Sequence, residues 1–306
     1  MGQETRSIGI AQARDVSPVM RLGYGVARSL SGIGAFGRRY PVGAVAGLVL
    51  LGVIITALAA PLLAPYHPIN DADFLARNKE PSGPHVLGTD SIGRDVLSRV
   101  IYGARISLFV AFLAVLIGDG AGLIWGVSTG YLGGKFDIYS QRVLELLMCL
   151  PTIILAMLLL LWLGAGILPV IIAIAITRIP LTVRVIRSVA LPVRETAYIE
   201  AARAMGASSL RIMALHVTPQ VLAPWLVLAT AHLGAVIVLE ASLGFLGVGI
   251  PPPTPTWGNM LGGEVATILV PRWWLVISPG VAITITVLAI NLFGDAIRDH
   301  LDPKLR

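Results

Sequence analysis

The chain has 306 residues, of which 56% are hydrophobic and 13% charged, with a mean hydropathy of +0.81 and a formal net charge of +6. An average soluble domain carries about 25% charged residues, roughly twice this share. So few charges exclude an ordinary soluble enzyme and a disordered chain, and they indicate an all-α polytopic membrane protein. The single cysteine, Cys149, excludes an intrachain disulfide and a thiolate metal cluster.

The apolar stretches predict six transmembrane helices, because a membrane-crossing helix needs about 20 mostly apolar residues. The uncharged stretch 146–177 is too long for one crossing, and a turn at Gly164-Ala165-Gly166 divides it into two spans. The six predicted spans cover residues 41–64, 106–132, two spans within 146–177, 219–240 and 274–296.

Basic residues are distributed unevenly between the predicted connections. Seventeen of the 23 precede span one, follow span six, or lie in the connections between spans two and three and between spans four and five. The positive-inside rule therefore predicts that both termini are cytoplasmic, so the net charge reflects topology and indicates no nucleic-acid partner. The expected organisation is a tail or elbow helix at 1–40, a first helix at 41–64, an outer loop with an interfacial helix at 65–105, a five-helix core at 106–297 with a cytoplasmic loop at about 190–218, and a tail at 298–306.

The cytoplasmic loop between spans four and five predicts two short helices joined by a glycine. Ala and Glu favour a helix as far as Met205, and Gly206 supplies the left-handed residue that ends it. Ser208 or Ser209 then caps a second helix that carries Leu210. Such an elbow offers a smooth face that fits a groove on another protein, although an ordinary amphipathic connector would show the same pattern.

The outer loop between spans one and two contains a polar segment that predicts a helix start. Thr89, Asp90 or Ser91 can cap a helix with one apolar face, and we expect this helix to lie along the outer membrane surface. Asp90 and Asp95 alone are too few ligands for a metal site.

A second outer connection, residues 247–258, is proline-rich and stiff. Three roles are open for this connection: contact with a docking protein, gating of a pathway, or simple connection of its neighbours. The sequence does not favour one of these roles. The tryptophans at 257, 273 and 274 suit the outer membrane interface.

No catalytic or nucleotide-binding motif occurs in the sequence. The only Gly-Lys pair, at 134–135, is followed by Phe and lacks the hydroxyl of a P-loop, so uphill transport would need an ion gradient or another subunit. Asp119 is the one clear ionisable group deep inside a span, and His232 and Glu240 are weaker candidates. We expect Asp119 to face the bundle interior rather than to carry protons, and Asp119 and Glu240 are the candidate pathway-lining residues.

Span two also carries four glycines at four-residue spacing, on one helical face: Gly118, Gly122, Gly126 and Gly130. Small residues in this pattern let a neighbouring helix approach closely. The ladder therefore predicts a packing face, inside the bundle or at a subunit interface, and not a ligand site.

Motifs from about residue 40 to the C-terminus occur in an order that is similar to one known family. They are Glu200-Ala201-Ala202 with Gly206 and Pro219, Leu87–Asp95 with its continuation to Leu108, Glu240-Ala241-Ser242-Leu243, Phe245-Leu246-Gly247, Trp257-Gly258, and the ending Gly294-Asp295 through Leu301-Asp302-Pro303. Together they resemble the C-type permeases of the dipeptide/oligopeptide/nickel branch of binding-protein-dependent ABC importers.

The resemblance implies the MetI-like fold of a type I importer permease in a bacterial or archaeal inner membrane, which carries di- or oligopeptides or a related small solute. It implies an ATPase-coupling loop formed by Glu200, Ala201, Ala202, Arg203, Gly206, Leu210 and Pro219. The outer signature implied is Gly88, Thr89, Asp90, Gly93, Arg94, Asp95 and Arg105. Two residues depart from the family pattern: Thr218 precedes Pro219 where Leu is expected, and Asp119 stands where a small or apolar residue is expected.

The implied partners are a second, homologous permease, two cytoplasmic ATPase subunits that bind ATP and magnesium, and an extracytoplasmic substrate-binding protein. The chain itself would hold no cofactor or metal and catalyse no reaction, and membrane lipid surrounds it. An importer for nickel, glutathione or glycosides of the same branch is one alternative. An ion-coupled secondary carrier is the alternative from another class.

Overall fold

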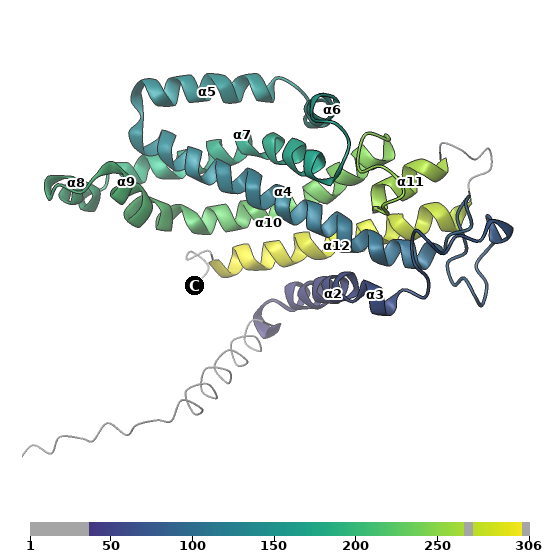
Figure 1. The fold of residues 1–306 in the computed structure, drawn as a ribbon. Coiled ribbons are helices and arrows are strands. Elements are labelled where there is room, and N and C mark those ends of the chain that lie inside the picture. Colours follow the sequence, from purple (N-terminus) through teal and green to yellow (C-terminus); the bar gives the residue numbers. More distant parts are fainter. Residues whose placement is uncertain (1–36, 266–271, 302–306) are drawn as a thin grey trace, which may run out of the picture.

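The computed structural model describes residues 37–265 and 272–301, and every regular element within these ranges is helical (Figure 1). Most of the predicted tails, at 1–40 and 298–306, lies outside the described residues. Within the described ranges five helices are long and apolar enough to cross a membrane. They are α2 (Pro41–Leu58), α4 (Val96–Leu132), α7 (Ile167–Arg194), α10 (Thr218–Phe245) and α12 (Trp273–Leu301).

The remaining predicted span is a bent pair of helices. α5 (Gly134–Met148) and α6 (Thr152–Leu163) meet at an angle of 92°. The 12 residues of α6 rise about 18 Å, short of the roughly 30 Å hydrocarbon core, so α6 cannot cross alone. With the bent pair counted as one crossing, the prediction of six spans is confirmed. The turn predicted at 164–166 is also confirmed, because Gly164 and Gly166 have φ of +87° and +145° between α6 and α7.

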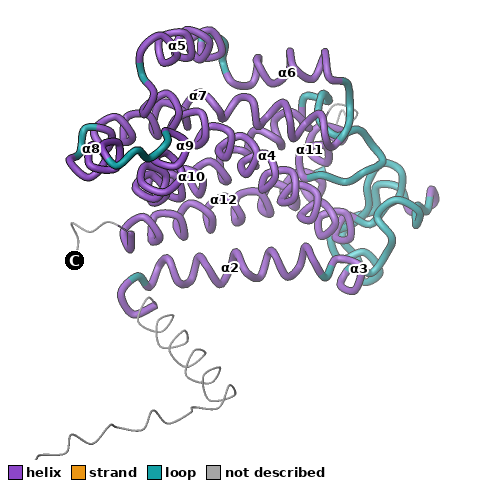
Figure 2. Tube along the Cα trace, turned by 60° about the vertical axis from the view of Figure 1, so that its left-hand side comes forward, coloured by secondary structure: helices purple, strands orange, loops and turns teal. Residues whose placement is uncertain are grey.

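Short elements gather at the two ends of the bundle. The additional helices are α3 (Ala60–Leu63), a 3-10 turn (Phe74–Ala76), α8 (Ala197–Ala204), α9 (Ser209–Ile212), a π-helical turn (Met213–Val217) and α11 (Trp257–Val265). Figures 1 and 2 place α8 and α9 at one end, here called the elbow end, together with the start of α2 and the end of α12. The opposite end, the loop end, contains the connection from α3 to α4.

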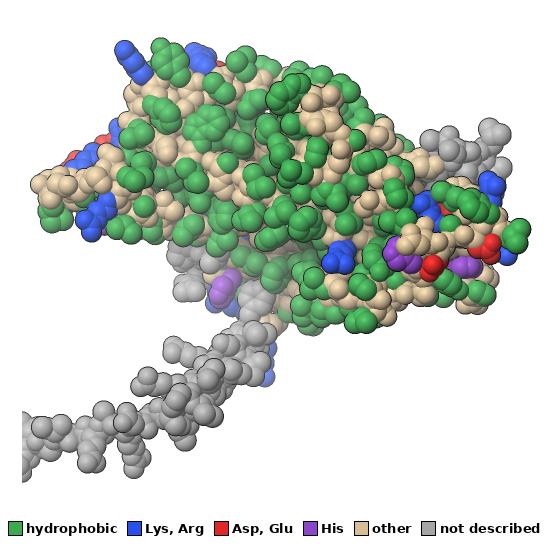
Figure 3. All heavy atoms as spheres, in the orientation of Figure 1, with side chains coloured by type: hydrophobic (Ala, Val, Ile, Leu, Met, Phe, Trp, Pro, Cys, Tyr) green, Lys and Arg blue, Asp and Glu red, His purple; other side chains and the backbone are tan. Residues whose placement is uncertain are grey.

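A hydrogen bond joins the first and last membrane-crossing helices at the elbow end. The hydroxyl of Tyr40 donates to the carbonyl oxygen of Asp299 at 3.2 Å. Between the two ends, hydrophobic side chains cover the face shown in Figure 3, and charged side chains gather mainly toward the ends. This distribution fits a membrane as the surrounding solvent, since charge is costly in the hydrocarbon core.

The glycine ladder of α4 packs against α7, as its spacing predicts. A Cβ added to Gly118 would come within 2.5 Å of the carbonyl oxygen of Ala175, and one on Gly122 within 2.6 Å of the Thr182 Cβ. Gly126 and Gly130 meet α7 in the same way, at 2.7 and 2.6 Å. Because nothing larger than hydrogen fits at these positions, α4 and α7 form one closely packed pair inside this subunit.

The structure corrects the expected interfacial helix. The cap is Asp95, whose carboxylate accepts from the backbone N–H of Ser98, and not Thr89, Asp90 or Ser91. From this cap α4 runs unbroken for 37 residues, so the expected surface helix is the first part of a membrane-crossing helix. The physical reason is that the sequence from 96 to 132 contains no proline, and glycine within it supports packing.

The predicted interface tryptophans are also corrected in part. Trp273 is exposed, but Trp257 and Trp274 are only 1% and 5% exposed. The indole Nε1 of Trp257 donates to the carbonyl oxygen of Val100 at 3.0 Å, and that of Trp274 faces the carbonyl oxygen of Thr89 at 3.4 Å. A buried indole is stable where its N–H finds such an acceptor. Here Trp257 attaches α11 to the start of α4, and Trp274 attaches α12 to the segment that precedes α4.

Candidate coupling surface and buried polar clusters

The loop between α7 and α10 forms the elbow that its sequence predicts. α8 ends at Ala204, and Gly206 follows with φ of +84°, a conformation that a side chain would strain. Of the two predicted caps the structure selects Ser208, whose hydroxyl accepts from the backbone N–H of Arg211 at 3.4 Å. The chain then turns through α9 toward α10.

One side of the elbow is anchored to the bundle. The side chains of Ile199, Ala202 and Ile212 are buried in an apolar cluster with Val127 of α4 and Ile186 of α7. The burial of these residues follows the period of a helix, since positions 199 and 202 are three apart on α8. The inner side of the elbow is therefore packed against α4 and α7.

The opposite side of the elbow is open to solvent. It consists of Glu200, Ala201, Met205, Gly206 and Leu210, here called the elbow face. Met205 is 81% exposed and Leu210 74% exposed. Large apolar side chains that extend together beyond the bundle end, beside a carboxylate, are typical of a surface that another protein covers.

A polar contact connects α8 to the end of α4. The guanidinium Nε of Arg203 donates to the hydroxyl of Tyr131 at 3.2 Å, and its carbon lies 5.0 Å from the centre of the tyrosine ring. Tyr131 is itself 6% exposed and is the residue before Leu132, where α4 ends. Arg203, which the resemblance assigns to the coupling loop, thus contacts the membrane-crossing helix directly.

The departure from the family pattern before Pro219 has a structural counterpart. The helix widens into a π-helical turn over Met213–Val217, and the hydroxyl of Thr218 donates to the carbonyl oxygen of Met213 at 2.8 Å. Pro219 has no N–H to donate, so a carbonyl in the preceding turn loses its usual partner. The Thr218 hydroxyl adds a second donor to the Met213 carbonyl, which also accepts the backbone N–H of Thr218, and Leu could not supply this contact.

At the loop end, Asp90 organises the outer signature segment. Its carboxylate accepts from the backbone N–H groups of Ile92 and Arg94, each at 2.9 Å, and from the Arg94 guanidinium at 2.6 Å. Arg99 lies 3.6 Å from the same carboxylate. Both carboxylate oxygens of Asp90 are therefore occupied by protein donors, which explains why an acid is buried here at 3% exposure.

Two glycines and a second acid complete this segment. Gly88 and Gly93 have φ of +73° and +86°, and a Cβ on Gly93 would lie 1.8 Å from the carbonyl oxygen of Asp73. The carboxylate of Asp95 lies 3.0 Å from the imidazole Nδ1 of His85, and the Thr89 hydroxyl donates to a backbone carbonyl. The structure thus brings together every predicted signature residue except Arg105, which lies farther along α4.

Asp119 belongs to a buried cluster that joins three helices. Its carboxylate accepts from the hydroxyl of Thr182 on α7 at 2.6 Å, and the Nδ1 of His232 on α10 lies 2.9 Å from both of its oxygens. The indole of Trp225 donates to the Asp119 carbonyl at 2.9 Å. Asp119 is 0% exposed, so it faces the packed interior, as we expected.

The contact between Asp119 and His232 is not among the features predicted from the sequence. Each sits within a membrane span, where an isolated polar group is costly, and that cost was a signal that the two should pair. The sequence does not give the rotation of the two helices, and this rotation decides whether the side chains meet.

Glu240 lies in a second buried cluster nearer the loop end. Its carboxylate accepts from the hydroxyl of Ser107 on α4 at 2.9 Å, and Thr256 lies beside it. The Ser107 hydroxyl also accepts from the backbone N–H of Trp257 at 3.4 Å. Because Glu240 is 1% exposed and Asp119 fully buried, neither predicted pathway residue reaches an open face of this subunit in the described conformation.

The helical bundle, with apolar side chains between its two ends, has the architecture of a multi-span membrane protein. Residues 122–306 match the family described as binding-protein-dependent transport system inner membrane component, and the chain belongs to this family. Its place in the peptide and glutathione branch of ABC importers follows from the similarity to curated relatives, and this confirms the family resemblance of the sequence.

Three relatives illustrate the branch. A putative peptide transport system permease of Brucella suis biovar 1 is 41% identical over 85% of this chain and 87% of the relative. The di/tripeptide transport system permease DppC of Pseudomonas aeruginosa is 40% identical over 86% of this chain and 89% of the relative. The glutathione transport system permease GsiD of Escherichia coli O1:K1 is 40% identical, with 88% of each chain covered.

A solved structure supports the fold. The inward-facing MetNI methionine ABC transporter contains a chain that matches with a TM-score of 0.54 and 22% sequence identity. The match covers 67% of this chain and 96% of that chain. The expected MetI-like permease fold is therefore confirmed.

Proposed function

We propose that this chain forms half of the translocation pathway of an ATP-driven importer for di- or oligopeptides or a related small solute. A second, homologous permease forms the other half, and two ATPase subunits bind ATP and magnesium. The elbow end is cytoplasmic, as the positive-inside rule indicates, and the loop end receives a substrate-binding protein. The names of the relatives, which refer to peptides, di/tripeptides and glutathione, support this substrate class.

The elbow is the observation that carries the proposal. Its outer side presents Met205 and Leu210 to solvent, while its inner side is packed against α4 and α7. An ATPase groove that holds the elbow face therefore holds the membrane-crossing helices too. Movement of the ATPase is transmitted through the buried side chains of α8 and through the contact between Arg203 and Tyr131.

The mechanism supported by this geometry is alternating access biased by ATP binding. The glycine ladder makes α4 and α7 one unit, and the Asp119 cluster joins this unit to α10. Packed helices with few voids respond to a displaced end as rigid bodies rather than by local deformation. Closure of two ATPase subunits then reorients this permease relative to its partner, and the chain itself catalyses no reaction.

Gly206 provides the sharpest test, because a side chain at this position would strain only the backbone and would meet no neighbouring atom. A Cβ at Gly206 meets nothing within 4 Å, yet φ is +84°. Gly206→Val therefore alters the angle of the elbow without disturbing the core. In the reconstituted transporter with its binding protein, we expect ATP hydrolysis to persist while uptake of a labelled dipeptide falls at least tenfold, a loss equivalent to about 1.4 kcal/mol of coupling.

Gly134→Val is the matched control, since Gly134 also has a positive φ, +60°, with nothing within 4 Å, but lies in α5 outside the elbow. It should leave the ratio of uptake to hydrolysis unchanged. A Gly206→Val transporter with normal uptake contradicts the coupling role. Transport activity in the purified chain without ATPase subunits contradicts the whole proposal. Uptake of dipeptide against glutathione, measured with the native binding protein, decides the substrate.

A further inference from the structure

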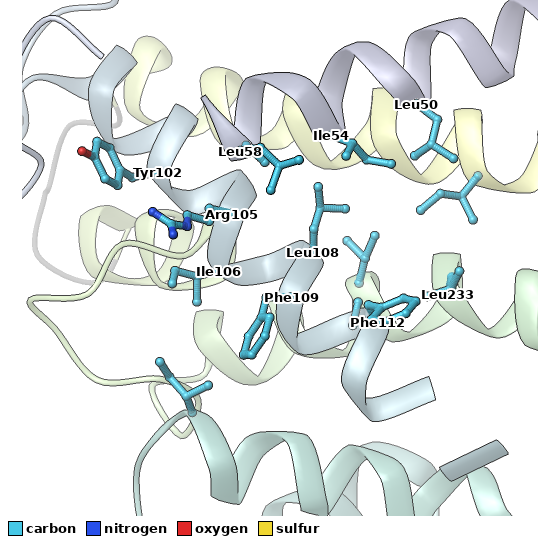
Figure 4. A pocket seen from close by; sticks show the side chains of 15 residues that line it. Leu50, Ile54, Leu58, Tyr102, Arg105, Ile106, Leu108, Phe109, Phe112 and Leu233 are labelled. Atoms are coloured by element: carbon cyan, nitrogen blue, oxygen red, sulfur yellow. The ribbon is translucent and has the colours of Figure 1, made fainter. Parts of the chain in front are cut away.

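An open cavity of about 770 Å³ lies between α2, α4, α10 and α12, outside both buried polar clusters (Figure 4). Figure 4 shows Leu50, Ile54 and Leu58 along α2, with Phe109 and Phe112 of α4 across the cavity. Apart from Arg105, every side chain that lines the cavity is aliphatic or aromatic. The volume is within the range of about 300–1,000 Å³ that is usual for ligand sites.

The one charged group in the lining is Arg105, at the end of the cavity nearest Leu58 and Tyr102. Arg105 is exposed. Among the ion pairs within residues 37–265 and 272–301, none joins Arg105 to an acidic side chain. The cavity therefore has an apolar body and a single cation at the end that faces the loop end of the bundle.

The depth of the cavity corresponds to one membrane leaflet. From Leu58 to Leu50 helix α2 advances about 12 Å, and from Arg105 to Phe112 helix α4 advances about 10 Å. Half of the hydrocarbon core is about 15 Å thick. Arg105 stands at the limit of the cavity nearer the loop end, and the apolar walls extend from it along α2 and α4 over a length close to that of one leaflet.

We propose that this cavity binds one phospholipid, with an acyl chain between α2 and α4 and the phosphate paired with Arg105. Guanidinium and phosphate form a planar, charge-assisted pair, which a lipid headgroup would make with Arg105. A helix of another subunit would fill the apolar part equally well. It would have to bring its own anion to this depth to pair with Arg105, at a cost that a lipid headgroup at the interface does not incur.

The experiment measures lipid that the complete transporter retains. The complex is purified from nanodiscs of phosphatidylglycerol and phosphatidylethanolamine into detergent, and native mass spectrometry counts bound lipid. We expect one tightly retained phospholipid at this permease. Arg105→Glu should weaken retention of phosphatidylglycerol about fivefold or more, whereas Arg105→Lys retains it.

A second variant tests the apolar part without changing charge. Ile54 is 39% exposed in the cavity wall, so Ile54→Trp fills the cavity without disturbing the buried core, and we expect it to displace the lipid. Arg142→Glu is the control, because the Arg142 side chain is 75% exposed on α5 and far from the cavity lining.

Three results would overturn the proposal. In the first, Arg105→Glu and Ile54→Trp retain as much lipid as the wild type. In the second, the wild type retains none and Ile54→Trp separates the two permeases, which would assign the cavity to the subunit interface. In the third, inorganic phosphate displaces the bound species, which would assign Arg105 to a free anion. Lipid retention is measured without ATP or substrate, so failure here leaves the proposed transport function untouched.

Discussion

The Nδ1 atom of His232 lies 2.9 Å from both carboxylate oxygens of Asp119, and this contact joins α10 to α4 inside the bundle. Thr182 of α7 donates to the same carboxylate, so one acid holds three membrane-crossing helices. Removal of one member of a buried polar pair leaves the other member buried without a partner. The resulting loss of folding free energy exceeds the net stability that the intact pair contributes.

Asp119→Ala is therefore expected to destabilise the purified permease by about 3–5 kcal/mol, measured as a lower midpoint of thermal unfolding in detergent. The double variant with His232→Ala should lose less than the sum of the two single losses, because the second change removes the group that the first left unpaired. Glu145→Ala is the control. It breaks an exposed ion pair with Arg142 and should change stability by less than about 1 kcal/mol. Strict additivity of the two single losses would contradict the pairing.

The glycine ladder leads to a prediction with a control on the same helix. Gly122→Ala places a methyl group 2.6 Å from the Thr182 Cβ, so α4 and α7 must separate, and we expect a loss of about 1–3 kcal/mol from overpacking. Gly120→Ala places the same methyl group where nothing lies within 4 Å. It should be neutral or slightly stabilising, because alanine favours helix over glycine. Equal thermal stability of the two variants would show that the close approach is unimportant.

Residue spacing predicted some features well and others poorly, for identifiable reasons. The glycine ladder and the elbow depend on neighbours in the sequence: a four-residue period sets a helical face, and Gly206 with Ser208 sets a turn. The pairing of Asp119 with His232 joins positions 113 apart, and no local pattern encodes which helix faces which. The burial of Trp257 is likewise long-range, since its acceptor is the carbonyl of Val100.

The continuity of α4 was missed for a different reason. Asp90 and Asp95 are both good helix caps, and the sequence alone does not rank them. The structure shows that Asp90 is occupied by Arg94 and by two backbone N–H groups, so it stabilises a turn that precedes the helix. Only Asp95 is left to cap α4.

The contact between Tyr131 and Arg203 predicts a defect in coupling without a defect in assembly. Tyr131→Phe removes the hydroxyl that accepts from Arg203 but keeps the ring beneath the guanidinium. The lost hydrogen bond amounts to about 0.5–1.5 kcal/mol, so we expect the number of dipeptides imported per ATP hydrolysed to fall roughly two- to tenfold. Co-purification of the ATPase subunits should be normal, because the elbow face is unchanged.

A control for this variant is available at an exposed tyrosine. Tyr139 of α5 is 69% exposed, and Tyr139→Phe should leave both assembly and the transport ratio unchanged. If Tyr131→Phe transports as efficiently as the wild type, the link between elbow and α4 depends on the apolar cluster around Ile199 and Ala202 alone.

Met205→Glu tests whether the elbow face binds the ATPase. The change places a charge on a side chain that is 81% exposed, so the permease should fold and insert normally. Burial of that carboxylate against an ATPase groove is costly, and we expect recovery of the ATPase with the tagged permease to fall severalfold. Leu75→Glu, at an 89% exposed leucine in the loop-end connection, should leave ATPase recovery unchanged. Equal recovery with both variants would mean that the ATPase does not bind the elbow face.

At the loop end, Gly93 is predicted to be essential for the outer segment. A Cβ at this position would lie 1.8 Å from the carbonyl oxygen of Asp73, and φ is +86°, so Gly93→Ala must displace the loop that holds Asp90. Asp90 would then lose its backbone donors and become a poorly compensated buried acid. We expect faster cleavage of residues 65–95 by added protease and weaker binding of the substrate-binding protein. Gly83→Ala, where nothing lies within 4 Å, should resist protease as the wild type does, and equal cleavage of the two variants would contradict this role of Gly93.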